Sequence, residues 1–190
     1  MKINNVIWLD IGTHFGQEYS SIFSSNSIFF LKIIKRIFNG NILNRQKSIN
    51  ISILKNIIHK RYQIRKQSKY FHSIFIEANP KIIFNKKIYS KADMIFNVAL
   101  TGEKKLITLK KLYLGQDGNL SQSSSIFSNK KNIKKNNYLI TVGVSNDVFF
   151  KDLKVNLNNK FSNYELILRL NCEGVEDEII YSVYKNFGKK

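Results

Sequence analysis

The sequence predicts an α/β fold built around a largely parallel β-sheet. Two observations lead to this prediction: short apolar runs alternate with helical segments along the chain, and several of these runs close on an acidic or amide residue. Short continuous apolar runs suit strands that are buried on both faces, as parallel strands are. Their alternation with helices is typical of doubly wound α/β domains.

Each expected element rests on a local pattern. The run at 6–11 (VIWLDI) is apolar and stops at Gly12, and the helical segments carry apolar residues on one face and Lys or Arg on the other. Asn39-Gly40 suits a helix end, and Pro80 suits the first turn of a helix. The first expected elements are a strand at 6–11, amphipathic helices at 30–39 and 53–66, a strand at 73–77 and a helix from Pro80. Strands follow at 94–100 and 104–114, the latter antiparallel to a neighbour, and then a polar loop at 115–137. The last expected elements are a strand at 138–144, a helix at 149–157, a strand at 166–172 and a helix at 175–187.

Composition limits the class of protein. The 190 residues, 43% of them hydrophobic, suffice for a single domain with its own core, which we place at 1–190. One Cys and three His exclude a disulfide scaffold and a zinc module, so no metal is expected. Charged residues interrupt the most apolar region, so we expect no transmembrane segment and a soluble, cytoplasmic protein.

The net charge of +18, from 31 Lys+Arg against 13 Asp+Glu, has two interpretations. A strongly basic chain is typical of proteins that bind nucleic acid or anionic membranes. The excess is mostly Lys and accompanies heavy use of Ile and Asn, a bias that an AT-rich coding sequence produces without any partner. Charge alone therefore does not decide the function.

The ends of the expected strands carry the residues that point to chemistry. Ligands of parallel sheets bind beyond the carboxyl ends of the strands, and here the first strand ends in Asp10-Ile-Gly12-Thr-His-Phe-Gly16 and the second in Glu77. The spacing of Gly12 and Gly16 does not match dinucleotide or P-loop motifs. D-x-G-x-x-x-G is instead the pattern of S-adenosylmethionine (SAM) sites, where a glycine turn lets the backbone approach the amino-acid arm.

Glu77 supports this interpretation, because a carboxylate at the end of a second strand can accept hydrogen bonds from both ribose hydroxyls. The stretch between Asp10 and Glu77 is longer than the ~20 to 30 residues of a compact unit. We therefore expect a helical insertion at about 40–70.

Several blocks in order resemble the FkbM family of SAM-dependent methyltransferases, over nearly the whole chain. They are Asp10-Ile-Gly12-x-x-x-Gly16-Gln17, Ile76-Glu77-Ala78-Asn79-Pro80, Asn97-Val98-Ala99-Leu100, Ser123-Ser124-Ser125 and Leu170-Asn171-Cys172-Glu173-Gly174-Val175-Glu176. The resemblance implies a class I methyltransferase fold, a Rossmann-like three-layer sandwich, and methyl transfer to a hydroxyl oxygen of a sugar, glycan or related small molecule.

The same resemblance implies roles for individual residues. Asp10, Gly12 and Gly16 would line the methionine arm of SAM, Glu77 would hold its ribose, and Asn97 and Val98 would lie near its adenine. His14 and Asn79 are further cofactor candidates because they lie within the first two blocks, although His14 can equally be a solvent-exposed loop side chain. Ser123 to Ser125 can be a substrate contact or an ordinary polar loop.

The chain departs from the family in two respects. Asn171 stands where many members carry an acid, which leaves Glu173 and Glu176 as candidate catalytic residues; either can instead simply favour the N-terminus of a helix. The expected elements do not include the final strands of the family's seven-stranded sheet, so we expect either a fragment or a sheet completed by another chain, with a homo-oligomer as one form.

A second hypothesis is a non-catalytic methyltransferase-like protein that uses its basic helices on nucleic acid or an anionic surface. Methylation of a nucleic acid is disfavoured, because Lys81 follows Asn79-Pro80 where an amino-methyltransferase would have a second proline.

Overall fold

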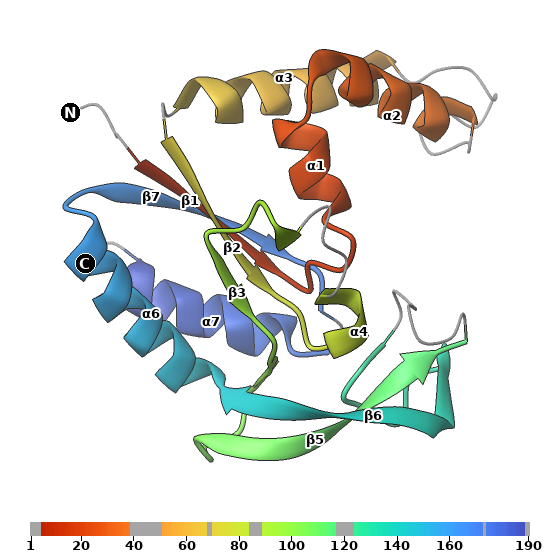
Figure 1. The fold of residues 1–190 in the computed structure, drawn as a ribbon, viewed down its shortest axis with the longest axis vertical. Coiled ribbons are helices and arrows are strands. Elements are labelled where there is room, and N and C mark those ends of the chain that lie inside the picture. The colour runs from red at the N-terminus through yellow and green to blue at the C-terminus, as the bar shows by residue number, and fades with distance from the viewer. Residues whose placement is uncertain are drawn as a thin grey trace.

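A computed structural model describes residues 5–38, 51–67, 70–83, 89–116, 124–172 and 174–188. Its centre is a four-stranded parallel sheet in the order β3-β2-β1-β7. The strands are β1 (Asn5–Ile11), β2 (Tyr70–Ile76), β3 (Met94–Phe96) and β7 (Tyr164–Leu170). β1 pairs in parallel with β2 on one side and with β7 on the other. The predicted α/β class with a mostly parallel sheet is confirmed (Figure 1).

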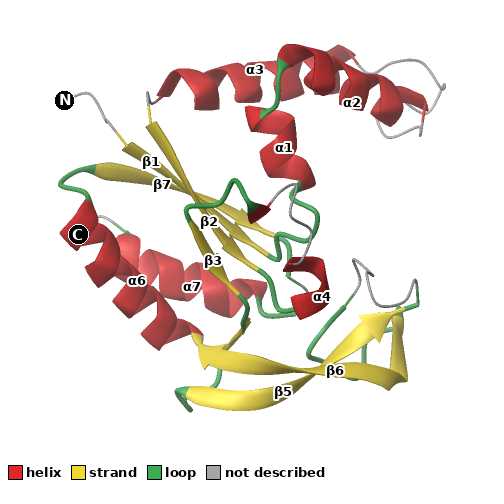
Figure 2. Cartoon of the chain, viewed as in Figure 1, coloured by secondary structure: helices red, strands yellow, loops and turns green. Residues whose placement is uncertain are grey.

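Helices pack on both faces of this sheet, which explains why its strands are mainly apolar. Alternate residues of β1 point to opposite faces, so Ile7 and Leu9 pack with α6 (Asn146–Lys160) and α7 (Glu176–Phe187). Trp8 packs on the opposite face with α1 (Gln17–Phe23). Figure 2 shows α1 on one side of the sheet and α6 and α7 on the other.

A second sheet of three strands lies beside the carboxyl ends of the first. It contains β4 (Ala99–Thr101), β5 (Ile107–Gly115) and β6 (Ile133–Ser145), in the order β4-β6-β5. β6 runs parallel to β4 and antiparallel to β5. The prediction of an antiparallel strand within 104–114 is therefore confirmed.

Two sequence-based predictions in this region are wrong. The run 94–100 forms two strands in different sheets, because the chain leaves β2 after Phe96, where Asn97 turns to donate its side-chain N–H to the Glu77 carbonyl at 2.7 Å. The segment 115–137 is not a polar loop throughout, since β6 already begins at Ile133, opposite Gly115. The pairing passes through a bulge there, and polar residues follow Ile133 on an exposed part of the ribbon. Residues 117–123 of that predicted loop lie outside the described residues.

Within the predicted insertion at about 40–70, the structure describes the helix α3 (Ile51–Gln67) and the first residue of β2, and residues 40–50 and 68–69 lie outside the described residues. α2 (Asn26–Phe38) precedes this segment and packs on α3 through Phe29 and Ile33. The two helices lie side by side at the end of the molecule remote from β5 and β6 (Figure 1). α4 (Pro80–Ile83) is the short helix expected from Pro80. None of the helices within the described ranges is long and apolar enough to span a bilayer.

Candidate functional site

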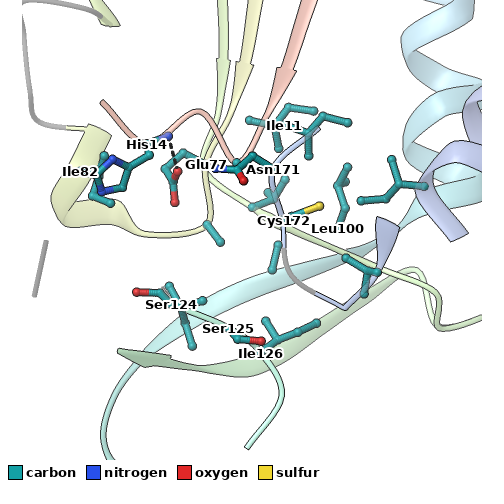
Figure 3. Close-up of a pocket in the computed structure, with 18 residues that line it drawn as sticks. Ile11, His14, Glu77, Ile82, Leu100, Ser124, Ser125, Ile126, Asn171 and Cys172 are labelled. Atoms are coloured by element: carbon teal, nitrogen blue, oxygen red, sulfur yellow. Dashed lines mark hydrogen bonds between the residues drawn. The ribbon is translucent and has the colours of Figure 1, made fainter. Parts of the chain in front are cut away.

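The carboxyl ends of β1, β2 and β7 form one side of a pocket of about 680 Å³, a volume that includes the part open to solvent. The other side comes from the second sheet and the segment at 124–126 (Figure 3). Four residues of the predicted cofactor set lie in its lining: Gly12, His14, Glu77 and Val98. A concave site between two sheets, at the carboxyl ends of parallel strands, is a usual place for a small-molecule ligand or cofactor.

The turn after β1 is held in an unusual backbone conformation. Gly12 has φ +70°, His14 φ +49° and Gly16 φ +55°, and Gly16 also caps the start of α1. A side chain at position 12 would place its Cβ 2.1 Å from the carbonyl oxygen of Asn171. Gly12 is thus required by the close approach of the β1 and β7 ends, and its backbone N–H donates to the Ile76 carbonyl at 2.8 Å.

Glu77 joins the ends of β1 and β2 through its carboxylate. Oε2 accepts the backbone N–H of His14 at 2.8 Å, and Oε1 accepts that of Asn79 at 2.9 Å. Figure 3 shows the bond between Glu77 and His14 at the edge of the pocket. Burial raises the pKa of Glu77, and the two backbone N–H donors oppose that rise. Each carboxylate oxygen has a second acceptor site, so Glu77 can bind these loops and a ligand hydroxyl together.

Asp10 is fully buried and lies outside the pocket lining. Its Oδ1 accepts from Arg169 at 2.8 Å, and the same guanidinium donates to the Gly12 carbonyl and to Glu18. Burial raises the pKa of Asp10 to about 6, while the Arg169 charge acts to lower it. Asp10 therefore stabilises the turn at Gly12 indirectly, through Arg169, and does not line the pocket.

Arg169 was missed in the sequence. The signal was present: it is the single cation in the strand 164–170 (YELILRL), which otherwise turns mainly apolar side chains to its neighbours. A cation in such a strand requires a carboxylate partner. The partner was difficult to identify because Asp10 and Arg169 face each other only through the pairing of β1 with β7.

The two asparagines predicted as cofactor residues support the end of β2. Asn79 is buried and its Oδ1 accepts the backbone N–H of Lys81 at 3.0 Å. Asn97 donates to the Glu77 carbonyl. Neither lies in the pocket lining, and Gly16 does not either. These residues shape the site, whereas Val98 faces into it.

Of the predicted catalytic acids, Glu173 lies outside the described residues. Glu176 is the first residue of α7, and its carboxylate accepts the backbone N–H of Gly174 at 2.6 Å. It is absent from the pocket lining, and the observed contact is that of an acid at a helix N-terminus.

The segment after β7 also supplies the pocket with Asn171 and Cys172. Burial raises the pKa of the Cys172 thiol to about 12. Ser124 and Ser125 lie in the lining opposite, and the backbone of Ser125 is fixed by reciprocal hydrogen bonds with Tyr113 of β5. Ser123 lies outside the described residues. Across the ranges that the structure describes, no group of His, Cys, Asp or Glu side chains is arranged to hold a metal ion.

Comparisons with protein-family models, with curated proteins and with solved structures find no match for this chain. The family resemblance of the sequence blocks therefore stays a prediction, and the functional argument rests on the site itself.

Proposed function

We propose that this chain binds S-adenosylmethionine in the pocket at the carboxyl ends of β1, β2 and β7, and that it transfers a methyl group to a hydroxyl oxygen of a sugar, glycan or related small molecule. The observation that carries the proposal is the position of Glu77. Its buried carboxylate stands at the end of the second strand of a parallel sheet, beside the turn that begins at Gly12, and lines the same pocket.

The sheet order supports the proposal. The order β3-β2-β1-β7 places three successive strands on one side of the sheet and returns the chain to the other side of β1. Ligands of doubly wound sheets bind where the strand order reverses in this way. A class I methyltransferase fold is the finer assignment that we infer from this order together with the sequence blocks.

The residues present fit the chemical groups of SAM. Glu77 provides an anionic acceptor for two ribose hydroxyls, and the turn from Gly12 to Gly16 exposes backbone to the amino-acid arm. Val98, Leu112 and Ile126 give the pocket an apolar side suited to a purine ring.

Bound SAM would supply an activated methyl group, so this chain's task is mainly alignment. Holding an acceptor hydroxyl in line with the methyl group can account for much of a rate enhancement. Glu77 orders the loops at His14 and Asn79 beside the pocket, which would help to fix the position of the bound cofactor relative to that acceptor.

Calorimetric titration of the purified protein with SAM tests the proposal. We expect measurable binding in the wild type and a roughly ten- to hundredfold loss in Glu77→Gln, since hydrogen bonds to a charged group contribute about 1.5–3 kcal/mol. Glu165→Gln is the matched control, because Glu165 lies at the opposite end of the sheet, near the start of β7.

Val98→Trp is an independent variant that fills the pocket and leaves Glu77 in place, with Val155→Trp on the exposed side of α6 as its control. A well-folded wild type that shows no affinity for SAM contradicts the proposal. If SAM binds but no labelled methyl group is transferred to a hydroxylated acceptor, the proposal of a SAM site stands and the proposal of methyltransferase activity is wrong.

A further inference from the structure

The helical hairpin of α2 and α3 exposes an unusual number of large apolar side chains. Phe38, Leu31 and Tyr62 have 84%, 64% and 61% of their surface exposed. We call the following set the hairpin surface: Phe30, Leu31, Ile34 and Phe38 of α2 with Ile51, Ile58 and Tyr62 of α3. Scattered exposed apolar residues are normal, but a contiguous group marks an interaction site.

Helical spacing places these side chains on one side of each helix, because Leu31 shares a face with Ile34 and Phe38, and Ile51 shares a face with Ile58 and Tyr62. Phe30 of α2 lines a groove together with Ile58 and Tyr62 of α3. Ile34 and Phe38 follow Phe30 at intervals of four residues, so they continue the same stripe along α2. The inward face of α2 is separate, because Phe29 and Ile33 are the residues that pack on α3.

The charges around this surface are all of one sign. Neither α2 nor α3 contains an acidic residue. Lys35 and Lys55 are exposed on the two helices, and Arg65 and Lys66 line the groove beside Tyr62. An apolar stripe bordered by Lys and Arg is typical of helices that lie in the interface of an anionic bilayer.

The hairpin is attached firmly to the rest of the molecule. The buried Arg61 guanidinium donates to the carbonyls of Ser21 and Ser24 and to Oδ1 of Asn26. It also lies 4.2 Å from the centre of the Phe29 ring. These contacts join α3 to the junction of α1 and α2. The hairpin surface is therefore fixed in position relative to α1.

We propose that the hairpin surface docks this protein on an anionic lipid bilayer, with the apolar side chains in the headgroup region and the cations on the lipid charges. The charges favour this occupant over a second copy of the chain, because two such surfaces would repel. Duplex nucleic acid would satisfy the cations but offers no apolar medium in which Phe38 and Leu31 could be buried. The proposal is independent of SAM binding.

Vesicle co-sedimentation tests the proposal with phosphatidylcholine vesicles that contain or lack phosphatidylglycerol. We expect binding to the anionic vesicles that weakens as salt is raised. Phe38→Ser/Tyr62→Ser should weaken it about tenfold for each lost aromatic side chain. Arg65→Glu/Lys66→Glu should weaken it about fivefold or more for each cation.

Matched controls lie elsewhere on the surface. Tyr181→Ser/Tyr184→Ser removes two aromatic side chains of comparable exposure, 65% and 71%, from α7, whose first turn is acidic. Lys134→Glu/Lys135→Glu reverses an exposed adjacent pair on β6. Both controls should bind like the wild type.

Three outcomes would overturn the proposal. The first is no binding to anionic vesicles by the folded wild type. The second is an equal loss in the controls. The third is binding that responds to salt and to Arg65→Glu/Lys66→Glu but not to Phe38→Ser/Tyr62→Ser, which together with tight binding of duplex DNA would identify a nucleic-acid surface.

Discussion

Gly12 is the residue on which the geometry of the candidate site depends most directly. Its φ of +70° is unfavourable for any side chain, and a Cβ there would meet backbone atoms of Asn171 that cannot swing aside. Because the turn brings Gly12 and His14 into the pocket lining, distortion at this point would move them both.

We expect Gly12→Ala to destabilise the protein by more than about 2 kcal/mol, from positive-φ strain and the backbone clash. Urea unfolding followed by circular dichroism measures this. Gly102→Ala is the matched control, since the new Cβ would meet only the Glu178 side chain, at 3.2 Å, and the expected change is within about 0.5 kcal/mol. Equal effects in the two variants would contradict the close approach of Gly12 to Asn171.

Arg169→Met should cost about 3–5 kcal/mol at pH 7, because it leaves the buried Asp10 carboxylate without a charged partner and with only the long hydrogen bond from Trp8. The loss should shrink on acidification. The pKa of Asp10 is already raised to about 6 in the folded protein, against 3.8 as its ordinary value, and removal of the cation raises it further. An acid whose pKa is raised by folding stabilises the folded protein at low pH. This stabilisation is lost as the pH rises through the pKa of the folded state.

Unfolding of Arg169→Met at pH 5 and pH 7 measures this difference. Glu18→Gln serves as the control, because it removes the partly exposed carboxylate on the same guanidinium and should cost no more than about 1 kcal/mol at either pH. A pH-independent loss in Arg169→Met would show that packing, not the charge on Asp10, sets the effect.

At the level of elements, local sequence patterns were sufficient to predict most strands of the parallel sheet and most of the helices that pack on it. β1, β2 and β7 were recognisable because each contains a short, mainly apolar run. The split between β3 and β4 was not recognisable, since 94–100 is one apolar run and the division follows from the Asn97 contact with Glu77. The start of β6 was hidden because Lys134 to Asn137 are polar, although they continue a strand.

The attachment of the hairpin was equally invisible in the sequence, where Arg61 is one of many cations on α3. Arg61→Met removes charge-assisted hydrogen bonds to three acceptors on α1 and α2. We expect hydrogen-exchange protection of α3 to fall by about 1–3 kcal/mol. The exposed Arg65→Met should leave protection unchanged. Unaltered protection in Arg61→Met would mean that apolar packing with Leu54 and Ile57 alone holds the hairpin.

At the scale of the whole molecule, the pocket exists only because the second sheet faces the ends of the first. Because Gly12 and Glu77 each follow a parallel strand, the sequence predicted that they lie at the same end of one sheet. The structure confirms this, since both residues line the pocket. It did not indicate that Leu112, Ser125 and Ile126 would close the opposite side. That depends on how β5 and β6 pair and where their ribbon lies, which no local pattern encodes.

The single cysteine gives a direct measurement of this closure. Cys172 lines the pocket, and burial raises the pKa of its thiol to about 12 from 9.0. Only the thiolate reacts with iodoacetamide, so alkylation at pH 8 should be about a thousandfold slower than for an exposed thiol. The thiol becomes reactive only as pH rises towards the raised value. The rate should therefore still be rising at pH 10, where an exposed thiol has reached its plateau.

The control is Cys172→Ser/Ser27→Cys, which moves the only thiol to an exposed position on α2. Its rate should level off near pH 10 and should not respond to SAM, whereas SAM should slow the alkylation of Cys172 in the wild type further. A fast reaction of Cys172 with a plateau near pH 10 would show that the thiol is exposed to solvent and that the pocket is not closed around it. If the alkylation of Cys172 is slow but SAM does not change its rate, the pocket is closed around the thiol and SAM does not bind in it.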